Sequence, residues 1–129
     1  MNIWYGTNEN AWLSNLAGRP FSDRLGRRYV SVEHAYQSWK SGSFDLQTYR
    51  KPWRAGVKFV GKPARKVNNW NVTLMEKLVL ASFKQNPELW RTLCLTAGEF
   101  THTQDKGLWG REFPRILRDV YHEGNIKSQ

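Results

Sequence analysis

The chain has little cysteine, few histidines and no long apolar run. Its single cysteine, Cys94, excludes an intramolecular disulfide and is typical of a reduced compartment, so we expect a cytoplasmic protein. No segment is long enough to span a bilayer and the N-terminus lacks the apolar stretch of a signal peptide, so we expect no membrane partner. The three histidines, His34, His102 and His122, lack metal-ligand spacing, so we expect no metal and no other cofactor.

Acidic residues are missing between Asp45 and Glu76, although cations are frequent there. The cations of this stretch are Arg50, Lys51, Arg54, Lys58, Lys62, Arg65 and Lys66. Aromatic residues (Trp53, Phe59 and Trp70) alternate with them, and the whole chain carries a net charge of +9. This pattern favours a phosphate-bearing partner, either nucleic acid or a nucleotide-like small molecule. An ordinary basic, solvated surface is an equally good interpretation of the same residues.

The length of 129 residues and the 40% of hydrophobic residues predict one domain with a real core. We expect the domain to cover residues 1–123 and a frayed C-terminal tail to follow at 124–129. Helices are predicted at 31–40, 45–49, from 60 onward, at 71–85, 87–98 and 114–122, and short strands at 2–5 and 99–103. A hairpin is predicted at 21–30. Because no βαβ alternation is visible, these elements predict an α+β fold, mostly helical with a small antiparallel sheet.

The segment 31–40 forms two faces when it is placed on a helix that Ser31 caps. Its apolar face consists of Val32, Ala35, Tyr36 and Trp39. Glu33, Gln37 and Lys40 form a polar row about 100° around the axis. The Cα atoms of Glu33 and Lys40 are then about 10 Å apart, so their side chains could reach one ligand from two ends of a cleft. The alternative interpretation of Glu33 is an ordinary solvated residue on the surface of the helix. His34 is expected either at the surface or in a position that supports the site.

A second candidate segment is 105–110, where Gly107 and Gly110 surround Trp109. The glycines predict a loop that presents the indole ring, which could stack on a base or a sugar. The carboxylate of Asp105 could stabilise developing positive charge nearby. A core tryptophan in a tight turn is the alternative interpretation.

An ordered series of short motifs runs through most of the chain. The series is Leu13-Ser-Asn-Leu16, Ser31-Val-Glu-His-Ala-Tyr-Gln37 with Lys40, Val60-Gly-Lys-Pro-Ala-Arg65, Phe83-Lys-Gln-Asn-Pro87 and Trp109-Gly110. Between about Trp4 and Tyr121 it resembles the YbiA-like or NADAR family. The resemblance implies a compact, mostly helical α+β fold with a cleft for ribosylated, phosphate-bearing ligands such as ADP-ribose. It also implies N-glycosidase chemistry, on riboflavin-pathway intermediates or on ADP-ribosylated guanine, including guanine in nucleic acid.

The resemblance assigns roles to particular residues. The catalytic residues that it implies are Glu33, Lys40, Asp105 and Trp109. The substrate-binding residues that it implies are Asn15, His34, Gln37, Gly61, Arg65 and Gly110. The family usually has an aspartate three residues before the tryptophan, whereas here Lys106 stands there and Asp105 lies one residue earlier. This departure keeps two alternatives open: a protein that binds ADP-ribose or NAD derivatives without turnover, and a basic nucleic-acid-binding protein.

Overall fold

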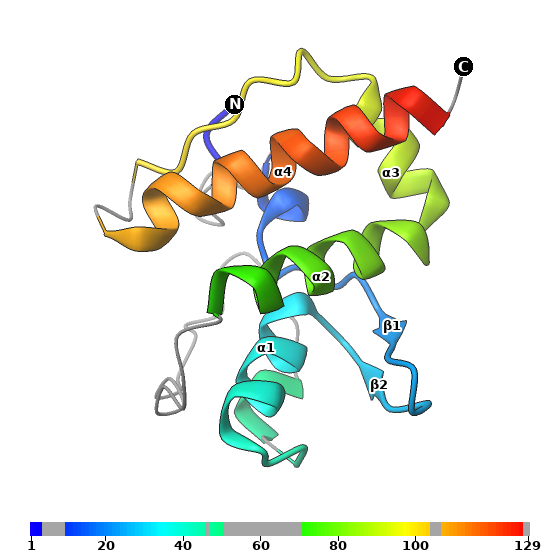
Figure 1. The fold of residues 1–129 in the computed structure, drawn as a ribbon, viewed down its shortest axis with the longest axis vertical. Helices are drawn as coiled ribbons and strands as arrows, with labels where there is room; N and C mark the ends of the chain where they lie inside the picture. The colour runs from blue at the N-terminus through cyan, green and yellow to red at the C-terminus, as the bar shows by residue number, and fades with distance from the viewer. Residues whose placement is uncertain (4–9, 46, 51–70, 104–106, 128–129) are drawn as a thin grey trace.

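The computed structural model describes residues 1–3, 10–45, 47–50, 71–103 and 107–127. In this part of the chain, four α-helices and a two-stranded antiparallel sheet form an α+β fold, which confirms the predicted fold class (Figure 1). The elements are η2 (Ala11–Leu13), β1 (Phe21–Ser22), β2 (Arg28–Tyr29), α1 (Val32–Ser41), η3 (Gln47–Arg50), α2 (Asn71–Lys84), α3 (Pro87–Cys94) and α4 (Leu108–Lys127). The helix predicted from residue 60 lies outside the described residues.

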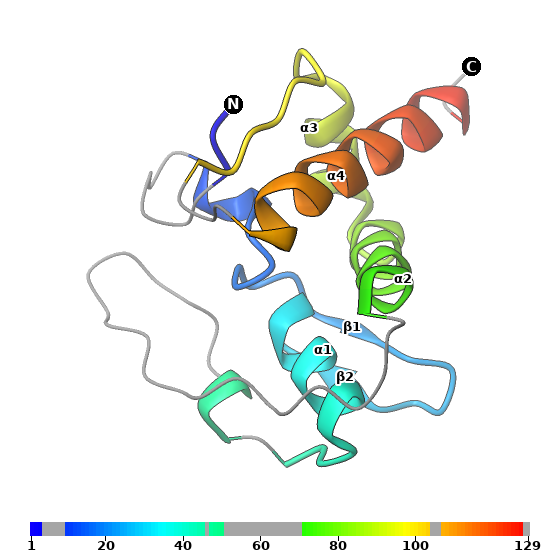
Figure 2. The same ribbon diagram turned by 60° about the vertical axis from the view of Figure 1, so that its left-hand side comes forward.

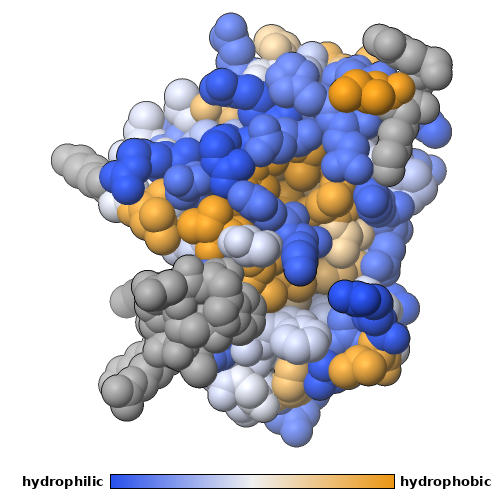
Figure 3. All heavy atoms as spheres, in the orientation of Figure 1, coloured by the Kyte–Doolittle hydropathy of each residue, from blue (hydrophilic) through white to orange (hydrophobic). Residues whose placement is uncertain are grey.

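Helix α2 is the centre of the fold, because a wide arc of its residues is apolar. It contacts α1, α3 and α4, and Figure 2 shows α3 and α4 on one side of it and α1 with the hairpin on the other. Its core residues are Leu74, Met75, Leu78, Val79 and Phe83. In Figure 3, apolar residues fill the space between α4 and α2, while hydrophilic residues cover the outer side of α4. One continuous core therefore joins the elements.

The hairpin and α1 form as their local sequences predict. Phe21 pairs with Tyr29 across the two strands, and Gly26 adopts a positive φ of 80° in the turn, where a Cβ would be strained. Ser31 caps α1, because its Oγ accepts the backbone N–H of His34 at 3.1 Å. The helix ends at Gly42, which is in the left-handed conformation.

The environment of His34 differs from the sequence expectation. The side chain is only 3% exposed, so the expected surface position is wrong. Its Nδ1 accepts the backbone N–H of Val30 at 3.2 Å, and its ring meets the ring of Tyr29 edge-on at 5.4 Å. The buried imidazole thus stabilises the start of α1 by joining it to Val30 and to Tyr29 of the hairpin.

Two expected boundaries in the segment after α2 are also wrong. Helix α3 ends at Cys94 and does not continue to Gly98, which adopts a positive φ of 76° farther on. The strand expected at 99–103 is reduced to a single parallel bridge between Asn2 and Thr101. Of the strand predicted at 2–5, residues 2 and 3 are described, and Asn2 forms the bridge.

Helix α4 is longer than predicted at both ends. It starts at Leu108, so Trp109 and Gly110 lie in its first turn and not in a glycine-rich loop. It continues to Lys127, so residues 124–127 are helical and do not form a frayed tail. The reason is tertiary packing: Gly124 is buried, and a Cβ placed there would lie 2.4 Å from Sγ of Cys94. The absence of a side chain at this position lets α4 approach α3 closely.

Candidate functional site

Three separate segments bring together a group of polar and aromatic side chains, which we call the Glu33 cluster. Helix α1 contributes Glu33, Tyr36, Gln37 and Lys40, the turn after η2 contributes Asn15, and the first turn of α4 contributes Trp109. The polar row predicted on α1 therefore exists, and it faces segments that are far away in sequence.

The carboxyl group of Glu33 is held at both oxygens by side-chain amides. Asn15 Nδ2 donates to Oε2, and Gln37 Nε2, one helical turn along α1, donates to Oε1 at 2.7 Å. The backbone N–H of Glu33 also donates to the carbonyl oxygen of Asn15 at 2.8 Å. Since each oxygen has two lone pairs, both retain the capacity to accept one more hydrogen bond from a ligand.

Burial dominates the electrostatics of this carboxyl group. Loss of water raises the pKa of Glu33 above its ordinary value, and the hydrogen bond from Gln37, the positive charge of Lys40 and the hydrogen bond from Asn15 oppose that rise only in part. A carboxyl group with a raised pKa and a charged neighbour is typical of acid–base sites. Carboxyl groups in ion-pair networks that only stabilise a fold show the same features. The neighbours of Glu33 are therefore needed to assign it a role.

Aromatic rings surround the charged groups. The Nζ of Lys40 lies 5.4 Å from the ring centroid of Tyr36, which in turn meets the ring of Trp109 edge-on at 5.6 Å. Burial and the charge of Glu33 raise the pKa of Tyr36 to about 12. The same two causes raise the pKa of Tyr49 on η3. A cation, a carboxyl group and flat rings therefore share one region of the molecule.

The structure tests only part of the predicted site. Asn15, Glu33, Gln37 and Lys40 come together, Trp109 contacts Tyr36 of the same helix α1, and Gly110 follows Trp109 in α4. His34 points to Tyr29 instead, although its Nε2 is buried without a hydrogen-bond partner among the described residues. The predicted site residues outside the described part of the chain are Gly61, Arg65 and Asp105.

The cationic stretch is described only at its beginning. Arg50 ends η3 and pairs with Asp45 at 2.7 Å, and the other cations of the stretch lie outside the described residues. The nucleic-acid interpretation therefore stays a prediction. Tyr49 is the neighbour of Glu33 that the sequence did not indicate, because it is neither at helical spacing from Glu33 nor in a recognised motif.

Fold and site together define a small α+β protein with a desolvated, amide-held carboxyl group beside a lysine and aromatic rings. Within the described ranges, no group of three His, Cys, Asp or Glu side chains could hold a metal ion, and none of the helices there is long and apolar enough to cross a membrane. No family model, curated protein or solved structure matches this chain.

Proposed function

We propose that this protein is an N-glycosidase that hydrolyses the bond between a ribose carbon and a nitrogen in a phosphate-bearing substrate. The observation that carries the proposal is the Glu33 carboxyl group, which is desolvated, fixed at both oxygens and flanked by Lys40. The motif resemblance to the NADAR family points to the same residue. ADP-ribosylated guanine and a ribosylated intermediate of the riboflavin pathway are the two substrate classes that this resemblance favours.

The proposed mechanism follows from the positive charge that develops on the sugar of the substrate. As the C1′–N bond breaks, positive charge builds at C1′, and an ionised Glu33 close to that carbon would stabilise it. Alternatively, Glu33 takes a proton from the water that attacks C1′, and the proton then passes to the leaving nitrogen. The raised pKa of Glu33 favours this exchange, because it makes the carboxylate a stronger base than an ordinary glutamate. In a third route, Lys40 acts as the nucleophile, and its amine traps C1′ of the ring-opened sugar as an imine.

Binding of the substrate would use the rest of the Glu33 cluster. The half-buried ring of Trp109, which packs against the buried Tyr36, offers apolar surface to a base or a ribose. The net charge of +9 favours a substrate with phosphate groups. Arg65 and the amides near Gly61 remain the predicted pyrophosphate contacts, on the basis of the resemblance.

The test is release of guanosine from ADP-ribosylated guanosine, followed by chromatography, with a ribosylamino-pyrimidine 5′-phosphate as the second substrate. Glu33→Gln should lower turnover by about a hundredfold or more, because it removes a group that exchanges a proton or stabilises charge in the transition state. Glu88→Gln is the matched control, since Glu88 also lies in the first turn of a helix, α3, but is exposed. Equal rates for the two variants would remove Glu33 from the mechanism.

One observation favours a second function, binding of ADP-ribose without turnover. Both Glu33 oxygens already accept hydrogen bonds from amides. A carboxylate held in this way is well suited to accept a further hydrogen bond from a ribose hydroxyl. Tight binding of ADP-ribose in calorimetry, with no product from either glycoside, would favour this function. Rapid release of a base would dismiss it.

A further inference from the structure

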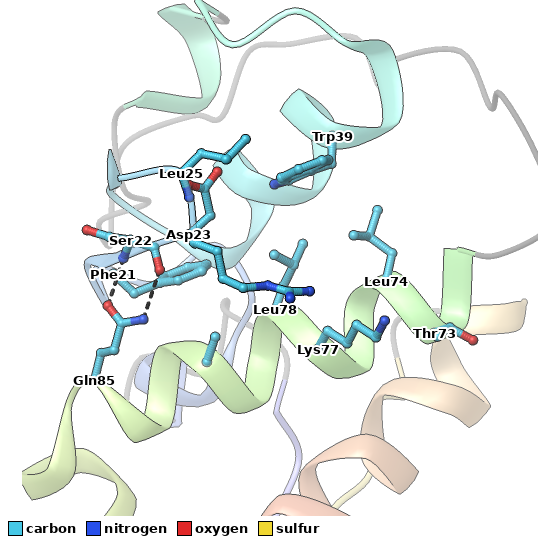
Figure 4. Close-up of a pocket in the computed structure, with 12 residues that line it drawn as sticks. Phe21, Ser22, Asp23, Leu25, Trp39, Thr73, Leu74, Lys77, Leu78 and Gln85 are labelled. Carbon is cyan, nitrogen blue, oxygen red and sulfur yellow. Dashed lines mark hydrogen bonds between the residues drawn. The ribbon is translucent and has the colours of Figure 1, made fainter. Parts of the chain in front are cut away.

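A pocket of about 750 Å³ lies between the hairpin, α1 and α2, and none of its lining residues belongs to the Glu33 cluster (Figure 4). Ligand pockets commonly have volumes of about 300–1,000 Å³ and mostly apolar walls. The apolar residues that line this pocket are Phe21, Leu25, Trp39, Leu74, Leu78 and Ala81. Its size and lining are those of a small-molecule site, at a place to which the proposed glycosidase assigns no role.

The floor and one wall of the pocket are rigid parts of the core. Leu74, Leu78 and Ala81 follow helical spacing along α2, and Phe21 of β1, which faces them from the hairpin, is only 1% exposed (Figure 4). Figure 4 shows the ring of Trp39 across the pocket from Leu78 and Lys77. A flat ligand could therefore lie between an indole ring and a leucine wall.

The indole ring is held in place before any ligand arrives. The guanidinium carbon of Arg27 lies 4.7 Å from the Trp39 ring centroid, and the ring of Phe44 meets the indole edge-on at 5.5 Å. Arg27 is itself fixed by an ion pair with Asp23, with Nε 2.9 Å from Oδ2. Preorganised aromatic walls reduce the entropy that binding costs.

Arg24 and Lys77 make the rim of the pocket positively charged. Arg24 and Lys77 are exposed, and neither forms an ion pair within the part of the chain that the structure describes. Asp23 also lines the pocket, but its carboxylate already accepts hydrogen bonds from Tyr29 and Arg27 and from two backbone N–H groups. Ser22 and Gln85 satisfy each other through two hydrogen bonds of 2.8 Å. The charged groups left for a ligand are therefore the two cations, beside the hydroxyl groups of Thr73 and Ser22.

We propose that this pocket binds a small aromatic anion. A flat ring system lies between Trp39 and the wall of Leu74 and Leu78, and its carboxylate or phosphate group contacts Lys77 and Arg24. Apolar contact with the ring supplies most of the affinity, and the two cations select anions over neutral or cationic rings. The site is independent of the Glu33 cluster, so its ligand need not be a substrate or product of the glycosidase.

The experiment uses 2-naphthoate as the probe and the full chain labelled with ¹⁵N. We expect saturable chemical-shift changes that concentrate at Leu74, Leu78 and the indole N–H of Trp39. The double variant Arg24→Gln/Lys77→Gln should bind about tenfold more weakly, because the charge-assisted contacts are lost. The double variant Arg28→Gln/Lys84→Gln is the matched control, with one arginine of the hairpin and one lysine of α2 outside the pocket, and it should bind like the parent protein.

Several results would overturn the proposal. They are an absence of shifts at millimolar probe, shifts that map away from the pocket, equal binding of the isosteric cation 2-naphthylmethylammonium, and an equal loss of affinity in the control variant. All four exchanged side chains are exposed, so the variants should fold, and circular dichroism checks this. Glu33→Gln should leave naphthoate affinity unchanged, so failure of this proposal and failure of the proposed function are separate outcomes.

Discussion

Asn15 and Glu33 are joined twice: the side-chain amide of Asn15 donates to Oε2 of Glu33, and the backbone N–H of Glu33 donates to the carbonyl oxygen of Asn15 at 2.8 Å. The turn after η2 is thereby fixed to the first turn of α1, and the orientation of the carboxyl group is set before a ligand arrives. Functional groups that are held by their neighbours in this way lose little freedom on binding.

The desolvated carboxyl group of the half-buried Glu33 predicts a pH-dependent effect of Glu33→Gln on stability. Because the pKa of Glu33 is raised in the folded state, its contribution to the free energy of unfolding is fully present below the unfolded pKa of about 4.5 and is lost as the pH rises through the folded pKa. The stability of Glu33→Gln relative to the parent should therefore improve as the pH increases above about 4.5, by up to about 1.4 kcal/mol per unit of pKa elevation.

Urea unfolding at a series of pH values between 4 and 8 measures this difference, with about 0.3 kcal/mol as a useful precision. Glu88→Gln, at an exposed position in α3, should give a profile parallel to that of the parent. If the Glu33→Gln profile also runs parallel, the carboxyl group is not desolvated in the folded state.

The positive charge of Lys40 predicts a shift in the titration of Glu33. Since this charge lowers the pKa of Glu33 in part, Lys40→Met should raise that pKa further. ¹³C NMR of the glutamate carboxyl groups measures the change directly. Lys84→Met, in the last turn of α2, is the control and should leave the Glu33 titration unmoved. A Glu33 pKa that is identical in all three proteins would show that Lys40 is too distant to act on it.

The turn of the hairpin depends on Asp23. Burial alone would raise the pKa of Asp23, but hydrogen bonds from Tyr29, from the Arg27 side chain and from the backbone N–H groups of Arg27 and Leu25 lower it to about 2. Asp23→Asn should destabilise the protein by about 2 kcal/mol at pH 7, because charge-assisted hydrogen bonds are lost. The contribution of Asp23 is present above its unfolded pKa of 3.8 and is lost as the pH falls toward about 2, so the difference should shrink there.

Denaturant unfolding at pH 7 and pH 3 checks this prediction. Asp119→Asn is the control, because Asp119 pairs with Arg115 on the exposed surface of α4. Its effect should stay within about 0.5 kcal/mol. A similar small effect for Asp23→Asn would contradict a structural role for the network around Asp23.

The close approach of α4 to α3 predicts that Gly124→Ala destabilises the fold. The new Cβ would lie 2.4 Å from Sγ of Cys94 and 2.5 Å from Nε1 of Trp90, which donates to the carbonyl oxygen of Val120 at 3.0 Å. We expect a loss of about 1–3 kcal/mol, although alanine by itself favours a helix. Thermal unfolding measures it, and Ile126→Ala, at a position 71% exposed, should change little. An unchanged or higher melting temperature for Gly124→Ala would mean that residues 124–127 do not pack on α3.

Local sequence was sufficient for elements whose signals lie within a few residues. The Ser31 cap and the periodic apolar residues placed α1, and the turn around Asp23 and Gly26 placed the hairpin. The row of Glu33, Gln37 and Lys40 follows from helical geometry alone. Element ends that depend on distant partners were missed: the start of α4 before Trp109 and its continuation past Gly124 are set by packing on α1 and α3.

The sequence by itself determined the fold class, the central helix and the identity of the acid, amide and amine on one side of α1, because these depend on periodicity and caps. Only the tertiary structure decided that Asn15 and Tyr49 lie close to Glu33, that Trp109 contacts Tyr36, that His34 is buried, and that a pocket opens between the hairpin and α2. Contacts between residues far apart in the chain result from how apolar faces pack against one another, and no short stretch of sequence contains that information.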